Sequence, residues 1–152
     1  MKRNSKRTIG LLFLLSLLTF FGCGGDEPTK QEKVTKLLTQ NGGVWEPSAA
    51  ANSITLEGID VQDELFPDFQ MTFTKTQITT PGTSPVWPAS DTWIFKDKNA
   101  DVLIRGSDDR EITIVSVTST ELIIQMSWDQ TTYETGRTAS LPGLYQFTLT
   151  KQ

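Results

Sequence analysis

The pattern of hydrophobic and polar positions divides the chain into a short apolar run, one amphipathic helix and a long region of alternating residues. The apolar run covers residues 9–21, carries no charge and follows a basic start that contains four Lys and Arg residues. It has 13 residues, whereas a helix that crosses a bilayer core needs about 20. An apolar run of this length after a basic start is typical of a secretory signal peptide, which we place at residues 1–22.

The only cysteine of the chain stands directly after this segment. The small residue Gly22 followed by Cys23 resembles a lipobox, in this looser form typical of Bacteroidetes. The resemblance implies cleavage between Gly22 and Cys23 and a diacylglyceryl group on the Cys23 thiol, and palmitate is expected as a lipid modification of the protein. An ordinary signal peptide with an incidental cysteine is the alternative. We expect a tether over residues 23–28 and an outer-membrane lipid anchor in the cell envelope, on the periplasmic or the surface leaflet.

One short helix is predicted after the tether. A capping-box pattern begins at Thr29, where a threonine and a glutamate three residues later bind free amides at the helix start. Val34, Leu37 and Leu38 then share one face. Asn41-Gly42-Gly43 ends the helix with residues that tolerate positive φ. This helix is expected to lie against the domain that follows.

After Gly43 the sequence becomes rich in threonine, β-branched and aromatic residues, with turn residues at short intervals. This composition predicts β-strands. The predicted strands are Val44–Glu46, Ser53–Glu57, Phe69–Thr74, Gln77–Thr80, Thr92–Lys96, Asp101–Arg105, Glu111–Thr118, Glu121–Asp129 and Leu144–Thr150.

Alternation is clearest in the last two predicted strands. Every second residue from Leu122 to Trp128 is apolar, and so is every second residue from Tyr145 to Leu149. This alternation predicts a sheet with one buried face and one wet face. Most connections are short, and short turns join antiparallel neighbours. We therefore predict an all-β domain at residues 29–152, an antiparallel up-and-down barrel of about eight strands. An immunoglobulin-like sandwich is the alternative.

The net charge of the chain restricts the classes of partner that we expect it to bind. Removal of residues 1–22 takes away four basic residues and no acidic one, which leaves 10 basic and 18 acidic residues and a net charge of −8. Nucleic acid is not expected as a partner, because neutralisation of phosphates supplies most of that affinity. Electrostatic docking to anionic lipid is not expected either, so the acyl chains on Cys23 are expected to hold the protein to the membrane.

The residue types exclude most catalytic chemistry. The chain contains no histidine, which removes Ser-His-Asp catalysis and most zinc and copper sites. No glycine-rich phosphate loop is present. We therefore expect no enzymatic activity, no cofactor and no metal. A calcium loop beginning at Asp97 was the nearest metal motif, but Val102 stands where that loop requires glycine, which favours a hairpin turn.

Three segments give the chain a family likeness. They are Gly43-Val44-Trp45 after the helix, residues 83–93 with two tryptophans, and the closing segment 143–149. With these segments the chain resembles the small lipocalin-like lipoproteins of Bacteroidetes. The resemblance implies a lipocalin-like barrel in which Trp45 plugs the closed end. The Thr-Asp-Tyr segment that lipocalins carry in a mid-chain loop is missing from this sequence, and Thr131-Thr-Tyr133 is not an adequate substitute for it.

The candidates for ligand or partner binding are Trp87, Trp93, Tyr133 and Arg137. Trp87 lies between two prolines, which favours a lid across one barrel mouth. Trp93 lies in a strand pattern, where core packing is the ordinary role. Tyr133 and Arg137 lie in the connection 130–143, which shows no strand pattern, and long loops on barrels often carry binding function.

Two functions remain open from the sequence. The first is a lipid-anchored barrel that binds a small apolar or amphipathic ligand in the envelope. The second is an interaction or structural lipoprotein with a filled barrel, which contacts another envelope protein through residues 81–91 and 130–143. An open barrel predicts an apolar pocket at one end, whereas a filled barrel predicts an interior occupied by its own side chains.

Overall fold

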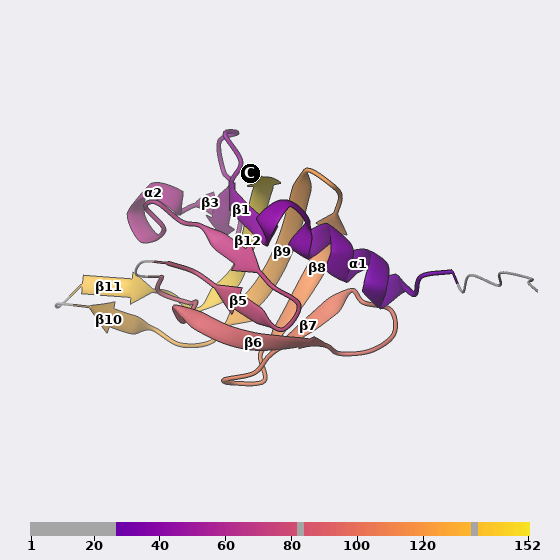
Figure 1. Ribbon diagram of the computed structural model, residues 1–152. Coiled ribbons are helices and arrows are strands. Elements are labelled where there is room, and N and C mark those ends of the chain that lie inside the picture. The colour runs from indigo at the N-terminus through magenta and orange to yellow at the C-terminus, as the bar shows by residue number, and fades with distance from the viewer. Residues whose placement is uncertain (1–26, 82–83, 135–136) are drawn as a thin grey trace, which may run out of the picture.

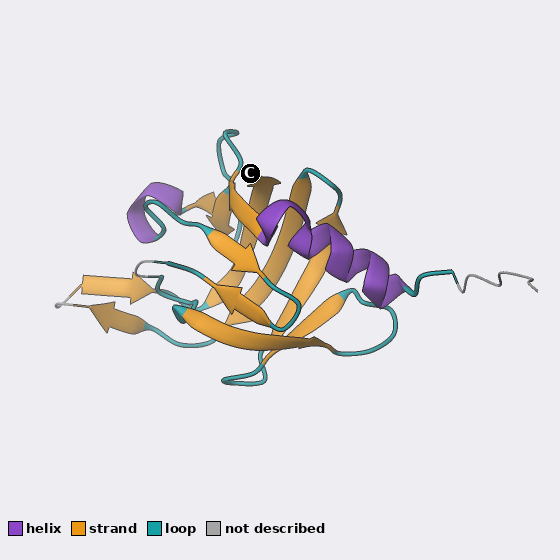
Figure 2. Ribbon diagram, in the orientation of Figure 1, coloured by secondary structure: helices purple, strands orange, loops and turns teal. Residues whose placement is uncertain are grey.

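The computed structural model describes residues 27–81, 84–134 and 137–152, and it describes side chains outside residues 132–140. The predicted signal peptide, Gly22 and Cys23 lie outside this part of the chain and stay predictions. The described chain forms one sheet that curls into a barrel, with a helix across one end (Figures 1 and 2). Its elements are α1 (Lys30–Thr39), η1 (Gln40–Gly43), β1 (Val44–Pro47), β2 (Ile54–Leu56), β3 (Ile59–Asp60), α2 (Gln62–Leu65), β4 (Met71–Phe73), β5 (Gln77–Thr79), β6 (Ser90–Phe95), β7 (Val102–Arg105), β8 (Glu111–Val117), β9 (Glu121–Trp128), β10 (Thr132–Glu134), β11 (Arg137–Ser140) and β12 (Gly143–Lys151).

Eight antiparallel strands close the barrel. Their order is β1-β4-β5-β6-β7-β8-β9-β12, and β12 returns to pair with β1. The order follows the chain, as in an up-and-down barrel. The predicted all-β barrel is confirmed, and the sandwich alternative is wrong because one continuous ladder joins the first strand to the last.

The first barrel strand is split into two parts. β1 and β2 pair with the same edge of β12, β1 opposite residues 149–151 and β2 opposite residues 145–147. Thr148 keeps the ladder continuous between them, because its carbonyl accepts from Ser48 N–H at 3.0 Å and its N–H donates to the Ser53 carbonyl at 2.7 Å. The nine predicted strands all exist, with ends within two residues of the prediction, and two of them share one barrel position.

Two short hairpins, β2–β3 and β10–β11, were not predicted from the sequence. In the first, β3 pairs with β2. The four-residue helix α2 follows, and β4 then pairs with β1. The interpretation of residues 130–143 as a connection without strands is wrong, since β10 and β11 form their own two-stranded sheet. Neither strand shows alternating apolar residues in its sequence, so the hydrophobic pattern gave no signal for them.

Helix α1 covers one end of the barrel. The capping box is formed as predicted: Glu32 N–H donates to Thr29 Oγ1 at 3.1 Å, and Thr29 N–H donates to Glu32 Oε2 at 2.7 Å. Val34 and Leu38 are buried against the strands. Gly43 then has φ +70°, and a Cβ at this position would collide with the Phe73 carbonyl. Only glycine fits this approach of η1 to β4, which explains the glycine two residues before Trp45.

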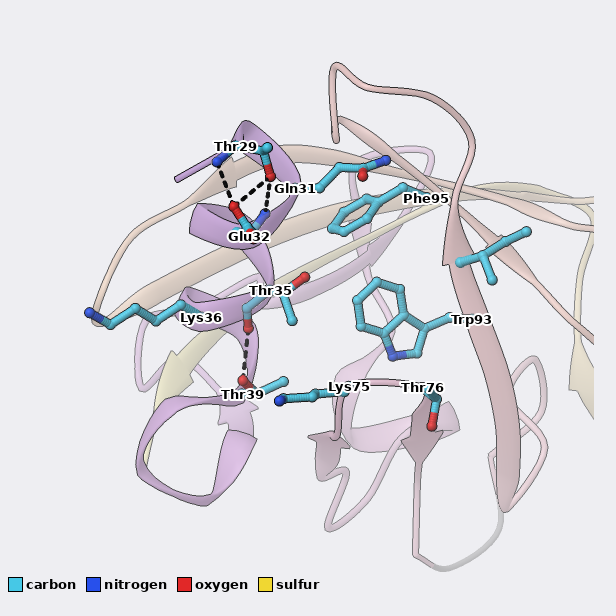
Figure 3. Close-up of a pocket in the computed structure, with 11 residues that line it drawn as sticks. Thr29, Gln31, Glu32, Thr35, Lys36, Thr39, Lys75, Thr76, Trp93 and Phe95 are labelled. Atoms are coloured by element: carbon cyan, nitrogen blue, oxygen red, sulfur yellow. Dashed lines mark hydrogen bonds between the residues drawn. The ribbon is translucent and has the colours of Figure 1, made fainter. Parts of the chain in front are cut away.

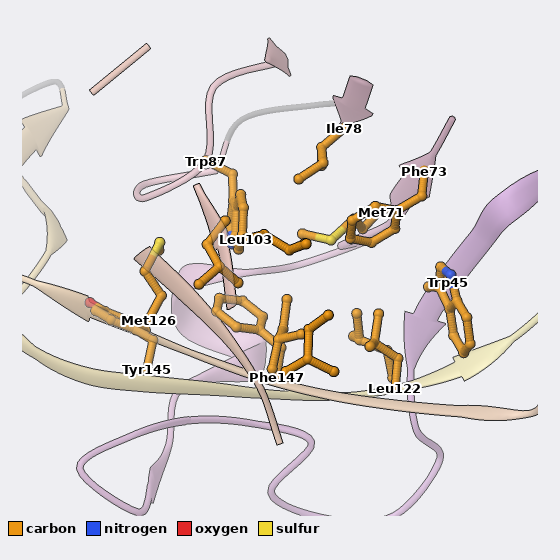
Figure 4. Packing of buried hydrophobic residues seen from close by; sticks show 14 of the residues in the cluster. Trp45, Met71, Phe73, Ile78, Trp87, Leu103, Leu122, Met126, Tyr145 and Phe147 are labelled. Carbon is orange, nitrogen blue, oxygen red and sulfur yellow. The ribbon is translucent and has the colours of Figure 1, made fainter. Parts of the chain in front are cut away.

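Large side chains occupy the interior of the barrel (Figure 4). Trp45, at the α1 end, is fully buried, and its indole N–H donates to the Leu38 carbonyl at 3.0 Å. Phe147 lies at the centre of an aromatic cluster, with ring centroids of four other aromatic residues within 6.4 Å. Those four are Phe66, Phe69, Trp87 and Tyr145.

Candidate functional site

The end of the barrel opposite α1, here called the mouth, is closed by the segment 84–89. Val86 and Trp87 of this segment are buried, and the Trp87 ring lies edge-on against Phe147 at 5.7 Å between centroids (Figure 4). Trp87 is therefore packed into the core at the mouth, as a lid requires. Its indole Nε1 is buried and finds no hydrogen-bond acceptor among the described residues, an arrangement that costs about 1–3 kcal/mol.

A buried charge lies beside this lid. Arg105, at the end of β7, is only 2 % exposed and points into the barrel. Its guanidinium donates to Asp108 at 2.9 and 2.6 Å through Nε and Nη2, and to the Val86 carbonyl at 2.7 Å through Nη1. Asp91 lies 3.8 Å from Nε and is itself nearly buried. The arginine therefore links β6, the lid segment and the β7–β8 turn.

Tryptophan and arginine side chains alternate across the mouth. The guanidinium carbon of Arg105 lies 5.5 Å from the centroid of the Trp87 ring and 5.8 Å from that of Trp128. Arg110 lies closer to Trp128, at 4.4 Å, and donates to Asp108 and Asp129 at 3.1 and 2.9 Å. Contacts of this type stabilise by about 0.5–2 kcal/mol each, more where water is excluded. The mouth cluster (Trp87, Asp91, Arg105, Asp108, Arg110, Trp128 and Asp129) is thus a connected network.

The electrostatics of the mouth cluster hold Asp108 in its ionised form. Hydrogen bonds from the Arg105 guanidinium lower the pKa of Asp108 to about 2, although partial burial opposes the shift and Arg110 supports it. A carboxylate with this pKa stays ionised at neutral pH, and general acid–base catalysis needs a group that titrates near the working pH. Among the described residues, no group of three or more acidic, Cys or His side chains is placed to hold a metal ion.

Trp93 has a different position. Its ring is buried near the α1 end, with its indole N–H donating to the Thr74 carbonyl at 3.1 Å and its edge against Phe95. Outside it runs an open groove of about 850 Å³ between α1, the β4–β5 turn and strand β6 (Figure 3). Trp93 and Phe95 lie on the floor of this groove, while Lys36 of α1 and Lys75 of the β4–β5 turn line its walls.

The remaining sequence candidates lie elsewhere. Tyr133 belongs to β10 and faces Thr138, and Arg137 belongs to β11 and faces Glu134. Their side chains are outside the described set, so their binding role stays a prediction. The structure thus brings Trp87 to the mouth and leaves Trp93 near the opposite end of the barrel.

Sequence analysis missed the central residue of the mouth, Arg105. One signal was present: Leu103 and Arg105 fall on the same face of their strand, and Leu103 is fully buried. A charged residue in an inward position is costly unless paired, so this register alone pointed to a partner inside the barrel. Asp108 three residues later supplies that partner.

No helix in the described part of the chain has the length and apolar character needed to cross a bilayer. Comparisons with family models, with curated proteins and with solved structures give no match. The fold and the mouth cluster therefore stand on the chain's own geometry, and the likeness to lipocalin-like lipoproteins stays a prediction from the sequence.

Proposed function

We propose that this protein is a lipid-anchored lipoprotein of the bacterial cell envelope, whose filled barrel is a rigid scaffold for a surface that contacts a protein partner. The basic start, the apolar run and Cys23 support the anchor. The partner surface is formed by the elements that gather around the mouth. In this proposal the protein has no enzymatic activity.

The observation that carries this proposal is the occupied interior of the barrel. An eight-stranded barrel has room for its own side chains or for one small ligand. Here four aromatic side chains along the length of the barrel are at most 1 % exposed to solvent: Trp45, Phe73, Tyr145 and Phe147. The side chains of Trp87 and Arg105 fill the mouth. The interior space that a carrier protein would leave free for its ligand is filled in this barrel by core side chains.

The mouth offers the surface for a partner. Around it lie α2, the β10–β11 hairpin and the lid segment (Figure 1). Exposed carboxylates gather between β2 and β4, and the whole stretch from residue 37 to residue 74 contains no lysine or arginine. Leu141, beside the hairpin, is 47 % exposed. Loops on a rigid barrel often carry binding function, and this surface suits a basic partner with an apolar residue at its centre.

The anchor is tested on the full chain expressed in a bacterium. Wild-type protein should fractionate with membranes, and its N-terminal peptide should begin at an acylated Cys23 in mass spectrometry. The Cys23→Ser variant should lose both the acyl mass and processing at this site. An unmodified Cys23 in mature wild-type protein would contradict the anchor.

The partner surface is tested by photo-crosslinking in cells. A photoreactive residue at Thr131 or Asp109, both exposed near the mouth, should give one discrete crosslinked product. The same residue at Asn99, exposed in the β6–β7 turn near α1, is the matched control and should not give that product. Equal products from both ends, or from neither, would contradict the proposed surface.

A second function has one observation in its favour. The unpaired indole N–H of Trp87 and the Val86 carbonyl bound by Arg105 belong to the same short segment. Withdrawal of this segment would open an apolar space beside a guanidinium, which suits a small amphipathic ligand with an acceptor oxygen.

Native mass spectrometry of the mature protein, purified gently from its own type of cell, separates the two functions. A co-purifying small molecule of constant mass would support the ligand carrier. A clean apo mass after exposure to envelope lipid extract would support the filled scaffold.

A further inference from the structure

Lysine residues are sorted to one end of the barrel. The described chain contains seven lysines, and each lies on α1, on a turn next to α1 or at the end of β12. They are Lys30, Lys33, Lys36, Lys75, Lys96, Lys98 and Lys151. Six of them are exposed, and Lys151 is partly buried. The net charge of −8 was summed over the whole mature chain and therefore gave no indication of this arrangement.

Acidic residues dominate the rest of the barrel. The α1 end comprises residues 27–44, 74–76, 96–101, 118–121 and 150–152, together with Glu46, which pairs with Thr150, and Glu111, which pairs with Lys96. It holds seven lysines and seven acidic residues, a net charge of zero. The rest of the described chain holds three arginines and ten acidic residues, a net charge of −7. The charge is therefore unevenly distributed along the barrel axis, with every described lysine at the α1 end.

Most of these lysines are free for an outside partner. Lys96 pairs with Glu111 at 2.5 Å, and Lys151 donates to the Leu38 carbonyl at 3.0 Å above the Trp45 ring. Among the described residues the other five form no ion pair. Lys36 and Lys75 stand on opposite walls of the groove described above (Figure 3), and Ile94, 66 % exposed, lies on the same side of the molecule.

The incoming chain reaches the barrel at this same end. Helix α1 begins at Lys30, and its N-terminal end leads to the tether, away from α2 and the β10–β11 hairpin (Figure 1). Cys23 precedes Thr29 by six residues, which span at most about 20 Å when fully extended. An anchor on Cys23 therefore keeps the α1 end close to the bilayer.

We propose that the α1 end lies on an anionic phospholipid surface, with its lysines on the headgroup phosphates and the acidic mouth turned away from the membrane. The acyl chains hold the protein to the bilayer, and the charge asymmetry sets its orientation. The proposal rests on the proposed lipid anchor and gives the anchor a second role, since it fixes which end meets the partner. Anionic headgroups attract juxtamembrane lysines within about one Debye length, roughly 8 Å at physiological salt.

The orientation is tested by NMR on residues 23–152, a piece that contains every described core contact. Its single thiol, Cys23, is coupled to a maleimide phospholipid in nanodiscs that also contain a paramagnetic headgroup lipid. With phosphatidylglycerol present, amides of α1 and the 97–100 turn should broaden strongly, while amides of the 106–110 turn stay sharp. This contrast should shrink in phosphatidylcholine nanodiscs and at high salt.

A pair of matched variants tests the lysines themselves. The triple variant Lys30→Gln, Lys33→Gln, Lys36→Gln should lose most of the contrast between the two ends. The triple variant Asp63→Asn, Glu64→Gln, Asp68→Asn removes three charges from the mouth end and should retain the broadening of α1. Vesicle sedimentation of the uncoupled domain should show binding to phosphatidylglycerol reduced at least roughly tenfold by the lysine variant, because each lysine near such a surface contributes on the order of fivefold.

Equal broadening of both ends, or broadening of α1 that is the same in anionic and neutral nanodiscs, would overturn the proposal. Chemical coupling replaces natural acylation in this experiment. A failure of lipidation in cells would therefore reject the proposed anchor and leave the orientation result to be judged on its own.

Discussion

At the end capped by α1, the barrel is closed by an apolar helix face, by the ring of Trp45 and by a single hydrogen bond from that ring to the helix. At the mouth, the closure is made by a buried arginine, its carboxylate partners and two tryptophan rings. The first closure comes from one continuous stretch, residues 29–45. The second brings together β6, β7, β9 and the lid segment.

This difference in origin implies a difference in response. Apolar packing does not depend on pH in the acidic range, whereas a network of ionised groups does. Packing errors should therefore be most costly at the α1 end, and changes in pH or charge should act mainly at the mouth. Four predictions test this division, beginning with the largest effect.

Removal of a tryptophan should cost most at the α1 end. Trp45→Ala should lower the free energy of unfolding by about 4 kcal/mol, the range for a large core aromatic, since Trp45 is fully buried and hydrogen-bonded. Trp87→Phe should be close to neutral, because it keeps an aromatic ring against Phe147 and removes the unpaired N–H. Urea unfolding measures both. Trp45→Phe is the matched variant and should cost more than Trp87→Phe, because it removes the hydrogen bond to the Leu38 carbonyl. A larger loss of stability for Trp87→Phe than for Trp45→Phe would contradict the prediction.

Removal of the buried charge should be the largest single loss at the mouth. Arg105→Ala leaves the nearly buried Asp91 without its cation and leaves Asp108 with Arg110 alone, and breaking a buried pair costs about 3 kcal/mol. Lys96→Ala removes an exposed pair with Glu111 and is the matched control, with an expected cost below about 1 kcal/mol. Similar losses for the two variants in urea unfolding would mean that the mouth network contributes no more than a surface ion pair.

Acid should weaken the mouth through Asp108. Its pKa is about 2 in the folded protein and 3.8 in the reference state, so the folded chain binds fewer protons between these values. The stabilisation is complete above pH 4 and is lost as the pH falls through 2. Asp108→Asn should flatten the fall of the melting temperature between pH 4 and pH 2. Asp109→Asn, at the exposed neighbouring residue, should leave the slope as in the wild type.

The helix cap should give the smallest effect. Thr29→Ala removes the side chain that accepts from Glu32 N–H and should cost about 1 kcal/mol. Thr29→Ser keeps the hydroxyl and should retain wild-type stability. Thermal unfolding of both variants measures the difference, and equal melting temperatures for Ala and Ser would show that the cap contributes nothing to the α1 end.

The sequence predicted the α1 end well because its signals are local. A capping box, an i, i+3, i+4 face and a glycine before Trp45 all lie within residues 29–45, and each has a direct structural counterpart. The barrel itself followed from alternation and short turns. These signals need no knowledge of which distant segments meet.

The mouth was predicted poorly because most of its contacts join segments that are distant in the sequence. Trp87 was identified from its flanking prolines, but its partner Arg105 lies 18 residues away and belongs to another strand. The first strand is split because β1 and β2 both pair with the same edge of β12. Residues 44–57 carry no local signal for this pairing with a distant strand. The clustering of lysines likewise becomes visible only in the fold, which places the β4–β5 and β6–β7 turns next to α1.

The seam of the barrel joins the beginning of the domain to its end. Trp45 pairs with Lys151, 106 positions later, and β12 alone connects β9 to both parts of the first strand. A chain delivered from its N-terminus therefore cannot close its barrel until the final strand is free, and closure over this distance carries a large entropic cost. Until then β1, β2 and β9 expose unpaired edges, which are sites for aggregation. A truncation that removes β12 should leave the protein open at that seam, so closure of this barrel waits for its last strand.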